Sequence, residues 1–140
     1  MSKAVLISIR SGGCQKIMEG RKTIEVRKTR PKMDTPFKCY IYRSVLGGVV
    51  GEFICDRVTD LFENSRFWLN EDDILRTCLT ADEIRAYANG ANELYGWHIS
   101  NLKIYDTPRE LREFYAVPNE VEVALKAKPK PITRPPQSWR

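Results

Sequence analysis

The sequence predicts an α+β fold, a small β-barrel of five or six strands with short helices flanking its ends. Segments in which apolar and polar residues alternate recur along the chain, and this period of two is typical of half-buried strands. Short helix signals lie at the joints between these segments, as in a barrel whose ends are covered by helices. At 140 residues the chain fits one domain with one core.

The first three elements follow the order strand, helix, strand. Alternating aliphatic residues predict a strand over residues 3–10. The stretch Ser11-Gly12-Gly13 is suited to cap a short helix over residues 14–19, and Gly20 supplies its stop. Residues 23–27 alternate again, so they are expected to form the second strand.

A hairpin is predicted next. Residues 37–44 and 49–59 have the pattern of paired strands, joined by a glycine-rich turn at residues 46–48. Gly51 lies inside the second of these strands. A glycine there predicts a bulge or a close backbone approach, which is how a barrel wall bends.

The second half of the chain begins with a weakly patterned segment, residues 63–78. We interpret it as a short helical turn around the apolar cluster Phe67-Trp68-Leu69, followed by another helix from about Asp72. A capping box, Thr80-Ala-Asp-Glu83, then predicts a helix over residues 81–89. The acidic first turn of that helix agrees with the helix dipole.

The remaining elements are a long strand and two shorter segments. Residues 95–106 predict a long strand with a bulge. The pair Thr107-Pro108 is typical of a helix start, which would turn Leu111 and Phe114 inward. Residues 121–125 predict a short final strand.

The chain is expected to hold a single domain, residues 1–125, and a basic, proline-rich C-terminal tail, residues 126–140. Four of the eight prolines lie between Pro129 and Pro136 among lysines and arginines, which is typical of an extended segment. Trp139 offers an alternative, in which the tail docks against the domain through its indole ring.

The net charge of +5 hides a strong segregation along the chain. Residues 1–45 carry eleven basic and three acidic side chains, a net of +8, whereas residues 46–125 carry seven and fifteen, a net of −8. Residues 126–140 carry five basic side chains and no acidic one. This asymmetry indicates a polyanionic partner that meets a basic face.

Cysteine usage and hydropathy exclude several classes of protein. The four cysteines are 25, 16 and 23 residues apart, with no Cys-x-x-Cys pair and one histidine, so we expect neither a metal site nor a cofactor. Phosphate-loop and dinucleotide-binding fingerprints are absent from the sequence. Without a signal peptide or an apolar run of membrane-spanning length, the sequence predicts a cytoplasmic protein with reduced thiols and no membrane partner.

A candidate site lies on the strand at residues 23–27 and its flanks. Glu25 and Arg27 share one strand face, where a carboxylate and a guanidinium form a hydrogen-bonding platform that could read base N–H donors and hold a phosphate. The charged and hydroxyl residues that could converge on one cleft are Arg10, Lys22, Thr23, Glu25, Arg27, Lys28, Arg43, Ser44 and Glu52. The alternative is a solvated strand face whose charges serve solubility and block edge pairing.

Several motifs resemble the ASCH domain (activating signal cointegrator homology), a branch of the PUA-like superfamily, and in part a bacterial and phage subgroup of it. The motifs are Ser8-Ile9-Arg10, Gly20-x-Lys22-Thr23-x-Glu25-x-Arg27, Tyr40-Ile41-Tyr42-x-Ser44, Val50-Gly51-Glu52, Tyr95-Gly-Trp97 and Pro135-Pro136-Gln-Ser-Trp139. The resemblance covers nearly the whole chain. It implies a PUA-like β-barrel with flanking helices and a basic cleft for RNA or a nucleotide-like ligand.

The resemblance leaves catalysis open. Related amidohydrolases that deacetylate N4-acetylcytidine have Gly-Arg-Lys-Thr-x-Thr, in which the lysine activates the second threonine as nucleophile. This chain has Glu25 at that position, and a carboxylate cannot play the same part. Other ASCH proteins are reported as ribonucleases, for which Lys22 with Glu25 or Glu52 would be the catalytic candidates.

Three function classes follow from the sequence. The first is an RNA-binding or nucleotide-binding protein, for which we favour a monomer, and the second is a hydrolase acting on a modified nucleoside or on RNA. The third is an interaction module that uses Phe67 and Trp68, if both are exposed. Cys14 at a helix start and His98 beside a tryptophan have reactive alternatives, but a buried core cysteine and a hydrogen-bonded structural histidine are the expected roles.

Overall fold

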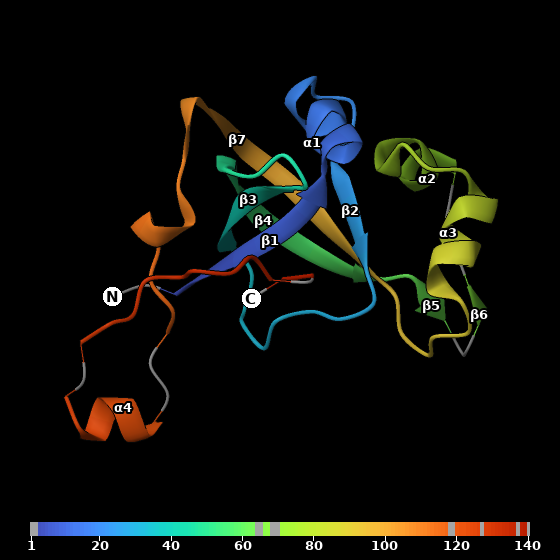
Figure 1. Cartoon of the computed structure of the whole chain (residues 1–140). Helices are drawn as coiled ribbons and strands as arrows, with labels where there is room; N and C mark the ends of the chain where they lie inside the picture. Colours follow the sequence, from blue (N-terminus) through green and yellow to red (C-terminus); the bar gives the residue numbers. More distant parts are fainter. Residues whose placement is uncertain are drawn as a thin grey trace.

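A strongly curled five-stranded sheet, in the strand order β1-β3-β4-β7-β2, forms the centre of the molecule (Figure 1). The computed structural model describes residues 3–63, 66–67, 71–117, 120–126, 128–136 and 138–139. The strands of this sheet are β1 (Ala4–Arg10), β2 (Ile24–Arg27), β3 (Phe37–Ser44), β4 (Val49–Asp60) and β7 (Tyr95–Arg109). The predicted α+β class, a barrel-like sheet with short helices, is confirmed.

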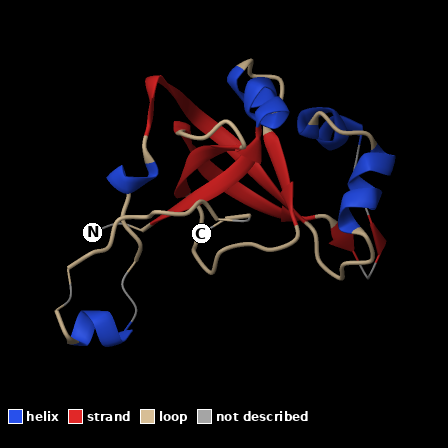
Figure 2. Cartoon of the chain, in the orientation of Figure 1, coloured by secondary structure: helices blue, strands red, loops and turns tan. Residues whose placement is uncertain are grey.

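Short helices surround the sheet without forming a layer of their own (Figure 2). They are α1 (Ser11–Met18), α2 (Glu71–Thr77), α3 (Ala81–Ala88), α4 (Glu120–Ala124) and a 3₁₀ turn, η1 (Leu111–Glu113). A two-stranded hairpin of β5 (Phe62–Glu63) and β6 (Arg66–Phe67) lies near α3.

The two edges of the five-stranded sheet are β1 and β2. β1 and β3 pair in parallel, and every other pairing in the sheet is antiparallel, so β2 runs antiparallel to β1. The curl brings these edges toward each other, and Arg27 Nη2 on β2 donates to the Ser8 carbonyl on β1 over 2.7 Å. The sheet is therefore joined across its opening by a charged side chain.

The main core lies inside the curl. It contains Trp97, Phe53 and Ile7, all fully buried, and Phe37 meets the edge of Trp97 with ring centroids 5.8 Å apart. A second cluster, around Ile84 of α3, packs the helix against the end of β2. Burial of this kind supplies most of the stability of a single-domain protein.

Gly51 bends the sheet where the sequence predicted a bulge. A Cβ at this position would lie 2.6 Å from the Lys103 carbonyl oxygen of β7, closer than such contacts occur. The β4–β7 register shifts beside it, between Val49 and Gly51. The close approach of the two backbones requires glycine, so the prediction is confirmed.

The predicted first strand, the 37–44 strand and the capping box of α3 are confirmed. The Thr80 hydroxyl accepts from the Glu83 N–H, and the Glu83 carboxylate accepts from the Thr80 N–H, each over 3.1 Å. The helix after β1 begins earlier than predicted, because Ser11 to Gly13 form its first turn. Phe67 belongs to β6, so a helical turn there is wrong, and its neighbours Trp68 and Leu69 lie outside the described residues.

Two predictions near the C-terminus are wrong. No α-helix starts at Pro108, because β7 continues through it and Arg109 still pairs with Val49; Leu111 and Phe114 nevertheless pack inward. Residues 121–124 belong to helix α4 instead of a strand, and Leu125, in the turn after it, donates its N–H to the Val121 carbonyl. This segment lies away from every sheet edge, so its valines have no strand to pair with (Figure 1).

The C-terminal segment returns to the sheet. Ile132 is buried against Leu6 and Val49, and the chain then crosses in front of β1 (Figure 1). Trp139 forms an antiparallel bridge with Ile7 and packs against Trp97 with centroids 5.9 Å apart. The end of the chain therefore docks against the domain through Trp139, as in the alternative considered from the sequence.

Candidate charged cleft on strand β2

Three charged side chains from one short stretch meet beside β2. Glu25 lies between two cations, with Oε1 3.6 Å from Lys22 Nζ and Oε2 3.7 Å from Arg27 Nη2. The side chains of Lys22, Glu25 and Arg27 are only 6, 11 and 11 % exposed. The solvated strand face considered from the sequence is therefore excluded, and we call these three residues the charged cluster.

The charged cluster is covered because both faces of β2 are packed. Helix α2 lies along β2, where Thr23 N–H donates to the Arg76 carbonyl and Lys22 Nζ donates to the Thr77 carbonyl over 2.7 Å. An ammonium group at the C-terminus of a helix is favourable, because the last carbonyls have no partner within the helix. Lys22 thus ties α2 to the strand.

Arg27 is held by a different set of acceptors. Nη1 donates to the Ser138 hydroxyl and carbonyl over 2.9 and 3.2 Å, and Nη2 donates to the Ser8 carbonyl. The carbonyls of Ser8 and Ser138 are contacts that sequence reasoning missed, since backbone acceptors leave no signal in residue identity. Only the tail motif with Trp139 gave a hint of them.

The charged cluster carries two positive charges and one negative charge in a largely desolvated place. Removing charges from water costs several kcal/mol per ion unless partners compensate. Buried charges in proteins are therefore paired or hydrogen-bonded, and one of the two cations here is not neutralised by a carboxylate of the charged cluster. The surplus here is positive, which suits a phosphate or another anion.

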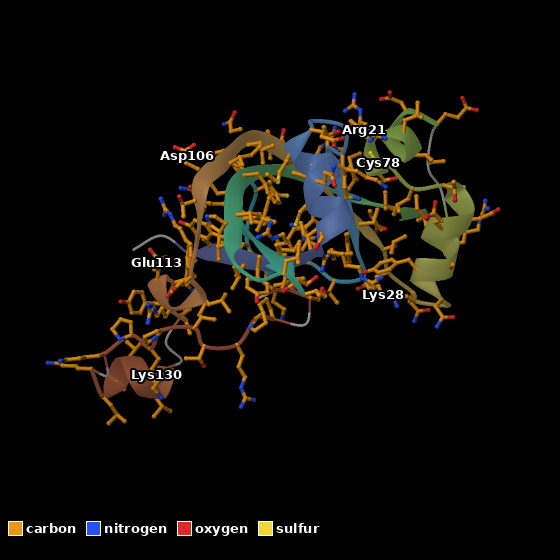
Figure 3. All side chains as sticks on the ribbon, turned by 45° about the horizontal axis from the view of Figure 1, so that its top comes forward. Arg21, Lys28, Cys78, Asp106, Glu113 and Lys130 are labelled. Atoms are coloured by element: carbon orange, nitrogen blue, oxygen red, sulfur yellow. The ribbon has the colours of Figure 1, made fainter. Side chains whose placement is uncertain are left out.

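Three other residues predicted for the site, Arg10, Arg43 and Lys28, lie on strands β1 and β3 and after β2. Arg10 is exposed and pairs in register with Ser44 at the carboxyl ends of β1 and β3. Arg43 Nε donates to the Gly47 carbonyl in the following turn over 3.3 Å. Lys28 is exposed on the α3 side, opposite Glu113 and Lys130 (Figure 3).

Glu52 does not join the charged cluster. Its carboxylate lies 3.0 Å from Lys38 Nζ and accepts from the Tyr105 hydroxyl over 2.9 Å. The acid–base pair of Lys22 with Glu52 is therefore not formed, whereas Lys22 and Glu25 are neighbours. From the sequence, Glu52 was grouped with Lys22 as one of the residues that could converge on a single cleft.

Glu52 gives a pH-dependent contribution to stability. Burial raises the pKa of its carboxyl, but hydrogen bonds from Lys38 and Tyr105 outweigh burial and lower the pKa below its usual range. The contribution is therefore present above about pH 4.3, the pKa of an unfolded glutamate, and is lost as pH falls through the folded pKa.

We accordingly expect Glu52→Gln to lower the free energy of unfolding by about 1 kcal/mol at pH 7 and by less below pH 4. Urea unfolding at pH 7, 5, 4 and 3 measures this difference. Glu19→Gln, at an exposed glutamate, is the control. A Glu52→Gln effect of the same size at every pH would contradict the assignment.

Cys14 and His98 take structural roles. Burial first, then Glu25, raises the pKa of the Cys14 thiol to about 11, although Arg43 opposes this, so the thiol stays protonated. The Cys14 thiol donates to the Ile9 carbonyl. Burial and then Arg57 lower the pKa of His98, whose ring nitrogens lie 3.2 Å from Thr59 Oγ1 and 3.4 Å from Arg57 Nη2.

Two cavities adjoin the loop between β2 and β3. Their volumes are about 440 and 570 Å³, and both are lined by Lys32, Met33 and Asp34. Lys3 and Lys38 line the larger one. Lys22, Glu25 and Arg27 line neither of these two cavities.

Within the described ranges, no group of three or more histidine, cysteine, aspartate or glutamate side chains is placed to hold a metal ion. No helix in the same part of the chain is long and apolar enough to span a membrane.

The curled five-stranded mixed sheet with short peripheral helices is consistent with the ASCH class of PUA-like folds. The chain superimposes on the crystal structure of ASCH from Zymomonas mobilis with a TM-score of 0.71, at 19 % identity, covering 99 % of this chain and 86 % of that one. Two mutants of the same Zymomonas mobilis protein match with TM-scores of 0.67 and 0.66, at 16 and 17 % identity, each covering 99 % of this chain and 89 and 87 % of theirs. The resemblance seen in the sequence is thus confirmed at the level of the fold.

No family model matches the sequence, and no curated protein matches it either.

Proposed function

We propose that the protein binds RNA or a nucleotide-like small molecule through a basic cleft built on the charged cluster. The observation that carries this proposal is the buried surplus of positive charge at Lys22, Glu25 and Arg27, in which two cations share one carboxylate. The sequence resemblance to ASCH proteins also supports it, because that resemblance implies a basic cleft for RNA or a nucleotide-like ligand and its motif includes Lys22, Glu25 and Arg27.

The three groups offer complementary chemistry. Lys22 has three N–H donors, of which one goes to the Thr77 carbonyl, and Arg27 presents a planar donor array suited to phosphate. Glu25 accepts hydrogen bonds, which suits the N–H donors on the edge of a nucleobase. Exposed Arg10 and Lys28 would contact flanking phosphates and steer the ligand.

Fluorescence anisotropy with a labelled single-stranded RNA tests the proposal. At low salt we expect Arg27→Ala and Lys28→Ala each to weaken binding by about tenfold, since an ionic hydrogen bond contributes roughly 1.5 kcal/mol. Each lost phosphate contact should also reduce the slope of log K against log salt by about 0.7. The matched control is Arg112→Ala, at an exposed arginine on η1.

Circular dichroism on every variant separates loss of binding from loss of folding. The proposal fails if the folded wild-type protein binds neither RNA nor nucleotides at low salt. It also fails if folded Arg27→Ala and Lys28→Ala bind as tightly as Arg112→Ala does.

The second candidate is a hydrolase acting on a modified nucleoside or on RNA. The contact of Lys22 with Glu25 supports it, because a lysine beside a carboxylate can exchange a proton with a substrate. Turnover of N4-acetylcytidine or cleavage of RNA that is lost in a folded Lys22→Met variant would support the hydrolase. Absence of turnover across nucleosides and RNA would contradict it.

A further inference from the structure

The free edges of β1 and β2 enclose a place that is occupied by the end of the chain itself. Ser8 N–H on β1 donates to the Ser138 carbonyl over 2.8 Å, and Arg27 on β2 donates to the same residue. Beyond β2, the Thr29 hydroxyl accepts from Trp139 Nε1 over 2.8 Å. We call this place, lined by Ser8, Arg27, Thr29 and Trp97, the β1–β2 slot.

The groups that fill the β1–β2 slot have the chemistry of a nucleotide. The indole of Trp139 is a planar heterocycle packed against Trp97, and its ring N–H donates a hydrogen bond to the Thr29 hydroxyl. Ser138 places two oxygen atoms within 2.9 and 3.2 Å of one guanidinium nitrogen. A nucleotide offers the same two elements, a planar base for stacking and oxygen acceptors for an arginine.

A second observation points to a ligand in the β1–β2 slot. Trp97 is fully buried, and its Nε1–H has no hydrogen-bond acceptor among the described residues. An unpaired buried donor costs about 1–3 kcal/mol, so buried indoles are usually paired. Trp97 packs directly against Trp139, so this unpaired donor belongs to a residue that lines the β1–β2 slot.

We propose that the β1–β2 slot is a nucleotide-binding site, and that Ser138 and Trp139 occupy it while no ligand is bound. The proposal rests on the proposed function, because Arg27 belongs to both. Ligand and tail then compete for Arg27 and for the face of Trp97. The apparent affinity is reduced by the fraction of molecules in which the tail is docked.

Removing the competing groups tests this inference. We expect the double variant Ser138→Ala, Trp139→Ala, and a chain ending at Pro135, to bind the four ribonucleoside 5′-monophosphates about tenfold more tightly than wild type in calorimetric titrations. Arg134→Ala, in the same segment but outside these contacts, is the matched control. Unchanged or weaker binding by the folded variants would overturn the inference and leave the proposed function standing.

A measurement on the wild-type protein covers the case in which these variants fail to fold. The indole N–H resonance of Trp139 should move toward its solvent-exposed position as a nucleotide saturates the protein, because the bond to Thr29 is broken. A Trp139 resonance that stays in place at saturation overturns the inference. If RNA binds and no nucleotide does, the slot is not a nucleotide site; if neither binds, the proposed function itself has failed.

Discussion

Glu25→Ala is expected to lower the free energy of unfolding by about 3–5 kcal/mol, because it leaves two buried cations without their shared carboxylate. In the wild-type protein the side chains of Lys22 and Arg27 are only 6 and 11 % exposed, and each lies within 4 Å of the Glu25 carboxylate. Urea or guanidinium unfolding, followed by circular dichroism, measures the change. A loss this large would be a substantial share of the stability of a domain of this size.

The control for this prediction is Glu19→Ala, which removes an exposed carboxylate and its pairing with Arg21. Exposed ion pairs contribute about 0–1 kcal/mol, so little change is expected. The triple change of Lys22, Glu25 and Arg27 to apolar residues of similar size should restore part of the loss, since no buried charge would remain. A Glu25→Ala effect as small as that of Glu19→Ala would mean that water reaches the charged cluster freely.

Trp97→Ala is expected to lower the free energy of unfolding by about 3–5 kcal/mol, through lost contacts and the cavity left in the main core. The Trp97 side chain is fully buried between Phe37 and Trp139. Thermal and denaturant unfolding give the change. Trp97→Phe should cost less, because most of the aromatic volume remains.

Trp139→Ala is the matched comparison, because it removes the same side chain from a partly exposed position on the other side of the contact. We expect about half the effect of Trp97→Ala or less, in proportion to the smaller apolar area that it buries. Equal losses in the free energy of unfolding for Trp139→Ala and Trp97→Ala would contradict this prediction. They would mean that Trp139 contributes to the core as much as Trp97 does.

The charged cluster and the contacts between Arg27 and Ser138 contribute differently to stability and to binding. The charged cluster must stay paired for the fold to be stable, and Lys22 also fixes α2 through the Thr77 carbonyl. The contacts of Arg27 with Ser138 can be exchanged for equivalent contacts with a ligand at little cost, because oxygen acceptors replace oxygen acceptors. Arg27 is thus the group through which binding is possible without loss of the fold.

Much of the candidate site could be predicted from one short stretch of sequence. Glu25 and Arg27 lie on strand β2 and Lys22 lies just before it, and the period of two places Glu25 and Arg27 on the same face. Their burial could not be predicted, because it depends on α2, some fifty residues away, and on Ser138. The contacts of Glu52 with Lys38 and Tyr105 could not be predicted either, since the position of a residue along a strand does not give its partners on the neighbouring strands.

The sequence by itself determined the local elements: the strand patterns, the Gly51 bulge and the Thr80 capping box follow from side-chain period, steric demand and hydrogen bonds within a few residues. The tertiary structure alone decided what covers β2, which carbonyls hold Lys22 and Arg27, and that residues 120–124 form a helix. The physical reason is that these outcomes depend on groups distant in sequence. The alternating valines of residues 121–125 would form a strand only if the edge of a sheet lay beside them. A buried cation is stable only where folding has brought oxygen acceptors to it.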